Sequence, residues 1–279
     1  MPAAPLVVSY GGGVDSTAVI VGLRRLCIRP AMIIFADVGC ERPETYAYMR
    51  LFSEYLARVG FPPITVVRYS HGEALYATLF DECIVNRSLP GLAWGAGRKT
   101  CSLKWKRDPI HAHLAKVFGA NTYLFIAIGY DNGDKDGRRV EKADRLPATG
   151  HFRNWYPLRD WGWDRGRCFA EIASERLEVP IKSSCFFCPA QKPGEVRWLV
   201  RSHPELADMI ALMETNAKPF IEIDGLWRGK RKDGRPGAIG EFVRMIREGR
   251  DDPRILDATE EVLTTNVLHG GDLEDPCQV

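Results

Sequence analysis

Short apolar runs alternate along the first 130 residues with longer segments whose apolar residues recur at helical spacing. Such runs, bounded by turn residues, are typical of strands buried in a parallel sheet. The pattern predicts strands near residues 6–10, 31–36, 64–69 and 122–130, and helices near 14–26, 44–59 and 109–118. This alternation predicts an α/β fold with a doubly wound, mainly parallel sheet.

The second half of the chain changes character, because helical spacing dominates it. We predict helices near residues 168–177, 195–199, 204–215 and 239–247, and an irregular tail after about residue 264. The sequence therefore predicts a main domain over residues 1–200. A smaller, mostly helical and irregular C-terminal extension would cover residues 201–279.

Composition excludes few classes of protein. The chain has 279 residues, 45% hydrophobic and 27% charged, and a net charge of +2, so no overall positive field marks a nucleic-acid binder. No apolar run approaches the roughly 20 residues of a membrane span, and the chain starts without a signal-peptide pattern. We expect a cytoplasmic protein, in which the eight cysteines serve as thiols or metal ligands rather than disulfides.

A glycine turn joins the first predicted strand to the first predicted helix. Its glycines are Gly11, Gly12 and Gly13. Glycine lacks a Cβ atom, so an anion can approach the backbone, and the following helix N-terminus favours negative charge. Ser16 can donate a hydroxyl, and Asp15 suits a magnesium ion beside phosphate. The turn predicts a phosphate site, with an ordinary βα turn as the alternative.

Two segments carry a resemblance to a known family. Residues 11–16 resemble the Ser-Gly-Gly-x-Asp-Ser loop of PP-loop ATP pyrophosphatases and sulfonucleotide reductases, with Gly11 in place of serine and Ser9 as a substitute hydroxyl. Residues 35–45 resemble the Phe-x-Asp-Thr-Gly-x-x-x-Pro-Glu-Thr segment of phosphoadenosine phosphosulfate (PAPS) reductases. The resemblance implies an adenine nucleotide alpha hydrolase-like fold. It also implies nucleotide contacts at Phe35, Asp37, Gly129 and Arg138.

A Cys-x-x-Cys pair, Cys185 and Cys188, is the second chemical signal. Two thiolates at this spacing reach one metal but cannot complete its coordination. Cys101 lies in a basic stretch that favours a thiolate, and residues 100–104 resemble the cysteine–lysine segment of sulfonucleotide reductases, with Thr100 replacing one cysteine. This resemblance implies a [4Fe-4S] cluster on Cys101, Cys185 and Cys188. The fourth iron would be open or held by Cys277. Zinc, a redox pair and a bystander thiol remain alternatives.

Most of the remaining cysteines are expected to pack in the interior, and the aromatic residues have two possible roles. We expect Cys27, Cys83 and Cys168 to be packing residues and leave Cys40 open. The aromatic stretch 155–163 resembles a Pro-Leu-x-x-Trp segment of the family; its rings could stack on a base or form core. The basic segment 228–235 could contact nucleic-acid phosphates or be a solvated loop.

The resemblance implies an ATP pyrophosphatase that adenylates a substrate for sulfur transfer, of the nucleic-acid thiolation or phosphorothioation class. Asp15, Ser16 and Lys104 would be catalytic, with Mg²⁺ bound beside ATP. A nucleic acid and a sulfur-donor protein such as a cysteine desulfurase would be partners, and the chain could form a homo-oligomer. One alternative is a PAPS or adenosine phosphosulfate reductase, with Cys277 on its tail. Another is a non-catalytic nucleotide-sensing module.

Overall fold

The computed structural model describes residues 4–70, 72, 75–91, 100–144, 151–229 and 233–251. Its strands are β1 (Leu6–Ser9), β2 (Met32–Asp37), β3 (Ile64–Arg68), β4 (Leu124–Ile128) and β5 (Phe152–Trp155). The helices up to the fourth strand are α1 (Val14–Arg25), α2 (Pro43–Arg58), α3 (Leu79–Val85), α4 (Thr100–Ser102), the π-helical segment η1 (Leu103–Arg107) and α5 (Asp108–Phe118). The later helices are α6 (Asp134–Asp144), α7 (Pro157–Asp160), α8 (Arg165–Ser174), α9 (Pro193–Ser202), α10 (Pro204–Ala217), the 3₁₀ segment η2 (Lys218–Phe220) and α11 (Ile239–Arg247).

The five strands form one parallel sheet in the order β3-β2-β1-β4-β5, which confirms the predicted α/β class. β1 is central: Val7 is in register with Met32 of β2 on one side and Ile126 of β4 on the other. The chain winds outward through β2 and β3, then crosses to β4 on the opposite side of β1. Ligands in open α/β sheets bind at such a reversal of strand order, beyond the carboxyl ends of the strands.

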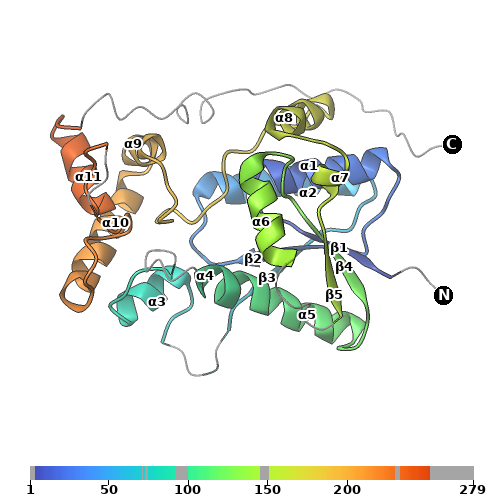
Figure 1. The fold of residues 1–279 in the computed structure, drawn as a ribbon, viewed down its shortest axis with the longest axis horizontal. Coiled ribbons are helices and arrows are strands. Elements are labelled where there is room, and N and C mark those ends of the chain that lie inside the picture. Colours follow the sequence, from blue (N-terminus) through green and yellow to red (C-terminus); the bar gives the residue numbers. More distant parts are fainter. Residues whose placement is uncertain are drawn as a thin grey trace.

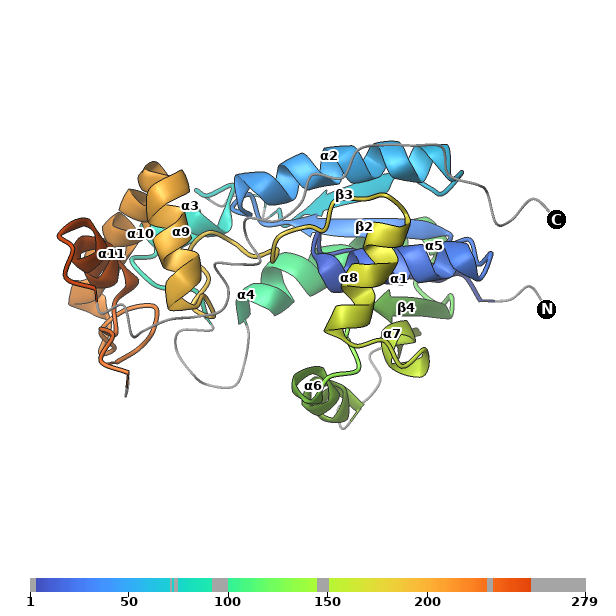
Figure 2. The same ribbon diagram turned by 90° about the horizontal axis from the view of Figure 1, so that it is seen from above.

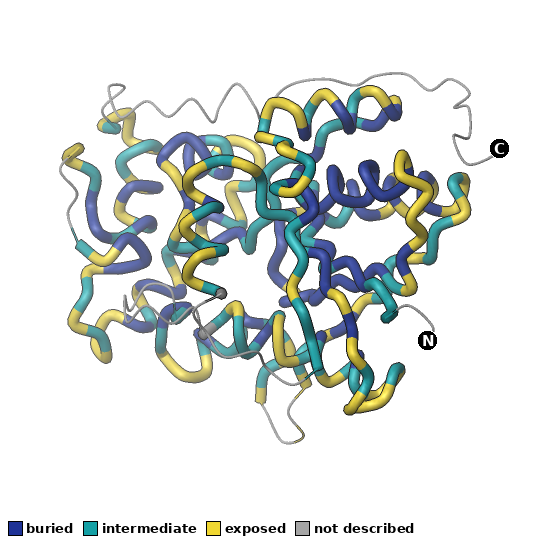
Figure 3. The backbone as a smooth tube through the Cα atoms, turned by 45° about the vertical axis from the view of Figure 1, so that its right-hand side comes forward, coloured by how far each residue is buried: buried dark blue, intermediate teal, exposed yellow. Residues whose placement is uncertain are grey.

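Helices cover both faces of the sheet (Figure 1). On one face α1, α2 and α8 enclose an apolar cluster that includes Val8, Ile33 and Phe35. On the other face α5 contributes Ile110 and Leu114 to a smaller cluster under β1, β2 and β4. Most of α1 is buried, as its dark tube in Figure 3 shows, because α8 covers the side that the sheet leaves open. The glycine turn is therefore held between rigid, buried elements.

A second group of helices lies beyond the carboxyl end of the sheet (Figure 2). Here α3, α9, α10 and α11 surround a third apolar cluster, to which Val38 and Trp105 also belong. The predicted boundary near residue 200 falls within α9. Because α3 and Trp105 come from the first half of the chain, this helical group is built from both halves. Within the described residues, no helix has the length and apolar character needed to cross a bilayer.

Several local predictions were wrong. No helix is predicted between the strand near 122–130 and residue 168, yet residues 131–139 contain the start of α6, whose sequence carries almost no apolar residue and shows no helical period. No helix is predicted around Cys101 either, yet this basic stretch is helical, and the buried Trp105 holds it against the core. Cys27 was predicted to pack, but it follows the end of α1 with φ of 53° and is exposed. Cys83 and Cys168 are buried as predicted.

Candidate functional site

The Ser16 hydroxyl holds the backbone of the glycine turn through two hydrogen bonds. The Gly11 N–H donates to Ser16 Oγ at 3.0 Å, and that hydroxyl donates to the Gly13 carbonyl at 3.1 Å. Gly12 has φ of +71°, a conformation that other residues rarely adopt. The turn leads directly into α1, whose first-turn N–H groups lack intrahelical partners. These features give a backbone suited to an anion at the carboxyl end of β1.

The turn has close neighbours on both sides. A Cβ atom on Gly12 would lie 2.8 Å from Thr45 Cγ2, so a larger residue there would disturb the packing of α2 as well as the turn. Gly129, at the end of β4, packs against the turn itself: a Cβ there would lie 2.7 Å from Asp15 C and 2.7 Å from Ser16 N. The structure thus places Gly129 in the site, in contact with the loop backbone.

Gly129→Ala is expected to lower the free energy of unfolding by about 1–3 kcal/mol, because the new methyl meets backbone atoms that cannot rotate away. Gly11→Ala is the matched control, since its Cβ would make only ordinary contacts, 3.7 Å from Ser16 Oγ. Urea denaturation of both variants and the wild type measures the effect. Equal stability of the two variants would contradict this description of the turn.

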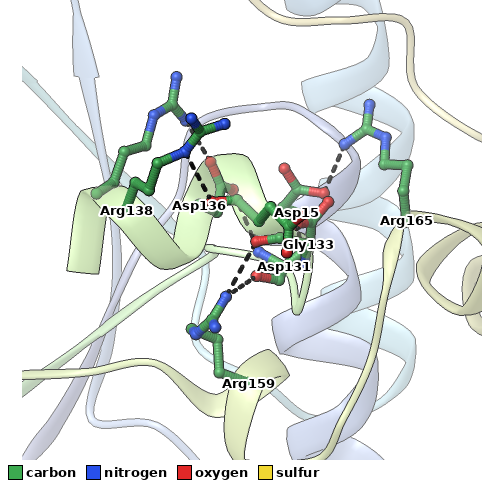
Figure 4. A network of polar contacts seen from close by, with 9 residues as sticks. Asp15, Asp131, Gly133, Asp136, Arg138, Arg159 and Arg165 are labelled. Atoms are coloured by element: carbon green, nitrogen blue, oxygen red, sulfur yellow. Dashed lines mark hydrogen bonds and ion pairs between the residues drawn. The ribbon is translucent and has the colours of Figure 1, made fainter. Parts of the chain in front are cut away.

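Three carboxylates converge beside the turn. Single oxygen atoms of Asp15, Asp131 and Asp136 all lie within 4.8 Å of one another (Figure 4). Asp136 is buried on α6; one of its oxygens accepts from the Asp131 N–H at 3.3 Å and the other from Arg139 Nη1 at 2.7 Å. Oxygen ligands of this kind suit Mg²⁺. The described residues therefore bring together three carboxylates that are a candidate for holding a divalent cation, where the sequence predicted only Asp15.

Two arginines position this carboxylate trio. Arg165, from the start of α8, donates to Asp15 Oδ1 at 2.5 Å. Arg159 donates to the carbonyls of Asp131 and Gly133 at 2.7 and 3.3 Å, which fixes the strand-end loop. Burial raises the pKa of Asp15; Arg165 opposes this shift and the two neighbouring carboxylates add to it. A bound cation would favour the charged form of Asp15.

Asp37 was predicted to contact nucleotide, but its carboxylate is hydrogen-bonded to other residues of the protein. Its carboxylate accepts from Tyr46 Oη at 2.7 Å, from the Gly39 N–H at 2.8 Å and from Arg68 Nη2 at 2.7 Å. Burial alone would raise the pKa of Asp37, but these hydrogen bonds and the Arg68 charge hold it below its usual range. The Phe35 ring is buried beneath Gly12. A nucleotide contact at these positions would use the backbone.

Asp37→Asn should lower the free energy of unfolding at neutral pH by about 1–3 kcal/mol, because the amide cannot accept all of these hydrogen bonds. A lowered folded-state pKa stabilises the protein above the unfolded pKa, and this contribution is lost as pH falls through the folded value. The difference between wild type and variant should therefore shrink in acid. Denaturation at several pH values tests this, and a constant difference would contradict it.

The cysteine pair is held at the end of β2. The segment carrying it pairs with the residues after that strand: Phe186 N donates to Cys40 O at 2.9 Å, and Glu41 and Cys185 form an antiparallel bridge. A turn closed by Cys188 N donating to Cys185 O at 3.0 Å brings the two thiols together. Thus both thiols face the same edge of the sheet as the glycine turn.

Two lysines lie near the pair, and each is ion-paired with a buried glutamate. Lys106 donates to Glu41 Oε1 at 2.7 Å, and Lys182 to Glu195 Oε2 at 2.9 Å. A hydrogen bond from Cys185 lowers the pKa of Cys188 against the effect of burial, and both lysine charges act in the same direction. The pKa of Cys185 is raised by that same hydrogen bond and by burial. Of the two thiols, Cys188 is therefore the one whose thiolate the site favours.

Ser183 joins the cysteine segment to the phosphate turn. An added Cβ on Gly13 would lie 2.6 Å from Ser183 Oγ, and one on Gly11 would lie 4.0 Å from it. Ser183 is two residues from Cys185, so the thiol pair and the turn belong to one site. Lys106 belongs to the basic stretch around Cys101 that the sequence predicts to favour a thiolate. Ser183 and Arg165 were not predicted as site residues, and the only sequence signal for either is that Ser183 lies close to the Cys-x-x-Cys motif.

Cys101 and Lys104 lie at a neighbouring cavity. This cavity of about 250 Å³ is lined by both residues and by Cys83. Lys104 forms an ion pair with Glu82, which is not one of the three clustered carboxylates. Among the described residues, only that trio brings three thiol, imidazole or carboxylate atoms within 4.8 Å, so Cys101 does not meet the pair at single-ion spacing.

The remaining predicted residues are placed more simply. Ser9 ends β1 and is half-buried. Arg138 is exposed on α6, where its Nε donates to the Asp134 carbonyl at 3.3 Å. Cys277 lies outside the described residues, as does the middle of the basic segment 228–235.

Comparison with known proteins gives little further guidance. No family model matches the chain, and no curated protein matches it. Among solved structures, the U34-tRNA thiolase NcsA from Methanococcus maripaludis, determined with its [4Fe-4S] cluster, is similar at 14% identity. The alignment covers 99% of this chain and 80% of that protein, with a TM-score of 0.44. This score is too low to establish a shared activity.

Proposed function

We propose that this protein is an ATP pyrophosphatase of the PP-loop type that activates a substrate by adenylation and couples this step to sulfur transfer. The contact between Ser183 and Gly13 carries the proposal, because it joins a thiolate pair to a phosphate-binding turn. Neither feature alone distinguishes these enzymes from other nucleotide-binding or metal-binding proteins. Their combination suits a reaction that uses a nucleotide and sulfur at one place.

The phosphate chain of ATP would lie over the glycine turn and the N-terminus of α1. Backbone N–H groups there stabilise negative charge that develops as the substrate oxygen attacks the α-phosphate and pyrophosphate leaves. The donor set of Asp15, Asp131 and Asp136 fits Mg²⁺, which would offset charge on the phosphates. Ser16 maintains the turn through its two hydrogen bonds. Ser9, at the end of β1, and Arg138, on α6, remain proposed phosphate contacts.

The thiols fit an iron–sulfur cluster better than a single zinc ion. Zinc would require further ligands about 2.3 Å from the metal, and the described residues bring no third ligand to the pair. A cubane spreads its thiolates over separate iron atoms. Cys185 and Cys101 border the same apolar cluster. We propose these two thiols and Cys188 as ligands, with Cys277 as the fourth. Such a cluster would supply sulfur or electrons.

The roles of the lysines follow from their contacts. Lys106 and Lys182 face the cysteine pair and would balance the negative charge of a cluster. Lys104 was proposed as catalytic; its ammonium is held by Glu82 and Tyr76, at the Cys101 cavity. A nucleic acid as the sulfur acceptor and a protein sulfur donor, such as a cysteine desulfurase, complete the proposal.

Anaerobic turnover assays test this function. The purified protein would be incubated with Mg²⁺ and either ATP or a sulfonucleotide, and pyrophosphate and sulfite would be measured. Pyrophosphate released from ATP supports the proposal. Sulfite released from PAPS or adenosine phosphosulfate would replace it with the reductase alternative, and nucleotide binding without turnover would favour the sensing module.

A further inference from the structure

Two tyrosines stack beside the carboxylate trio without belonging to the core. The rings of Tyr130 and Tyr156 are nearly parallel, 5° apart, with centroids separated by 5.6 Å. Arg139 places its guanidinium 5.7 Å from the Tyr130 centroid. Neither tyrosine is part of the three apolar clusters formed by the described residues, and both are partly accessible to solvent. Core packing therefore does not account for this stack.

The neighbouring tryptophans behave differently. Trp155, Trp161 and Trp163 pack against the apolar cluster beneath α1, and Trp161 closely contacts Gly22. The sequence left two roles open for the aromatic stretch 155–163, core packing and base stacking. In the structure, different residues of the stretch have different surroundings. Its tryptophans are partly buried and pack against the core, whereas the Tyr156 ring stacks on Tyr130 instead.

The location of the stack indicates what it could bind. Tyr130 comes directly after Gly129, which touches the glycine turn, and directly before Asp131 of the carboxylate trio. Tyr156 follows β5, at the same edge of the sheet. Phe35 and Asp37 of β2, where the family resemblance implies nucleotide contacts and where we place the adenine, lie on the opposite side of β1 in the strand order, as does the cysteine pair. The stack is therefore separate from the place expected for the adenine of ATP.

We propose that Tyr130, Tyr156 and Arg139 bind an unpaired base of the nucleic-acid substrate, next to the phosphate site. Aromatic and guanidinium planes bind bases of single strands by stacking, whatever their sequence. This inference rests on the proposed function, because it identifies the sulfur acceptor as a segment with at least one unpaired nucleotide.

The test is a double variant, Tyr130→Leu with Tyr156→Leu, which keeps apolar bulk but removes the flat rings. The probes are fluorescein-labelled, mixed-sequence, single-stranded RNA and DNA 20-mers, measured by anisotropy, and ATP, measured by calorimetry. The variant should bind the oligonucleotides roughly tenfold or more weakly, with unchanged ATP affinity. An otherwise identical abasic strand should bind equally to both proteins.

Tyr123→Leu is the matched control. Tyr123 is exposed and, like Tyr130, has an arginine near its ring: Arg153 lies 5.3 Å from the centroid. However, Tyr123 precedes β4, at the opposite end of the strand. It should leave oligonucleotide affinity unchanged. Circular dichroism and thermal unfolding verify that all variants are folded.

Three results would overturn the inference: no binding of either strand by the wild type, equal binding by a folded double variant, or loss of ATP affinity alone. The last would assign the stack to adenine. Pyrophosphate release by the wild type, assayed without any oligonucleotide, tests the proposed function separately. The two assays therefore test base binding by the stack and ATP cleavage independently, so either hypothesis can be contradicted without the other.

Discussion

Asp15→Asn is expected to reduce magnesium-dependent pyrophosphate release from ATP roughly a hundredfold or more. The asparagine keeps the size of the side chain but removes one of the three negative charges of the trio. In the wild type, single oxygens of Asp15, Asp131 and Asp136 all lie within 4.8 Å of one another. Overall folding should survive, because Asp15 is only partly buried and its recorded side-chain partner, Arg165, is itself partly exposed. Pyrophosphate assays over a range of Mg²⁺ concentrations measure the loss.

Asp134→Asn provides the control for this experiment. Asp134 begins the same helix, α6, and is exposed, but it does not belong to the carboxylate trio. It should retain wild-type turnover. Mn²⁺ binding followed by electron paramagnetic resonance gives a second readout, which should weaken in Asp15→Asn and in Asp131→Asn. Full turnover with unchanged Mn²⁺ affinity in Asp15→Asn would remove the metal site from the proposal.

Cys185→Ser and Cys188→Ser should each abolish iron and sulfide binding in anaerobically prepared protein, and with it sulfur transfer. Each replacement removes a soft thiolate ligand, and the described residues offer no third ligand atom close to the pair as a substitute. Cys101→Ser should give the same loss if that thiol reaches the cluster. ATP should still bind to the Cys188→Ser protein, because the glycine turn does not depend on this thiol.

Cys27→Ser is the control, since this thiol is exposed beyond the end of α1 and far in the chain from the pair. Iron, sulfide and visible absorption should match the wild type. Stoichiometric zinc in a colourless wild-type protein would contradict the cluster, and so would metal retained by both single variants. Cys277→Ser, examined in the same way, determines whether the tail supplies a ligand.

The local pattern was sufficient to predict most of the sheet and its helices. The apolar runs correspond to β1 to β4, because buried parallel strands need continuous apolar sequence. Failures occurred where tertiary contacts replaced local signals. α6 is polar along its length, and its Asp136 is buried by contacts to Arg139 and the Asp131 backbone rather than by apolar packing.

The candidate site follows the same division. The sequence by itself determined the glycine turn, Asp15 beside it and the Cys-x-x-Cys pair, since each is a local motif whose residue types limit its chemistry. The tertiary structure alone brought Asp131 and Asp136 to Asp15 and Ser183 to Gly13. These contacts join segments far apart in the chain, and their geometry depends on strand order and on which face of each helix is buried. No local pattern contains that information.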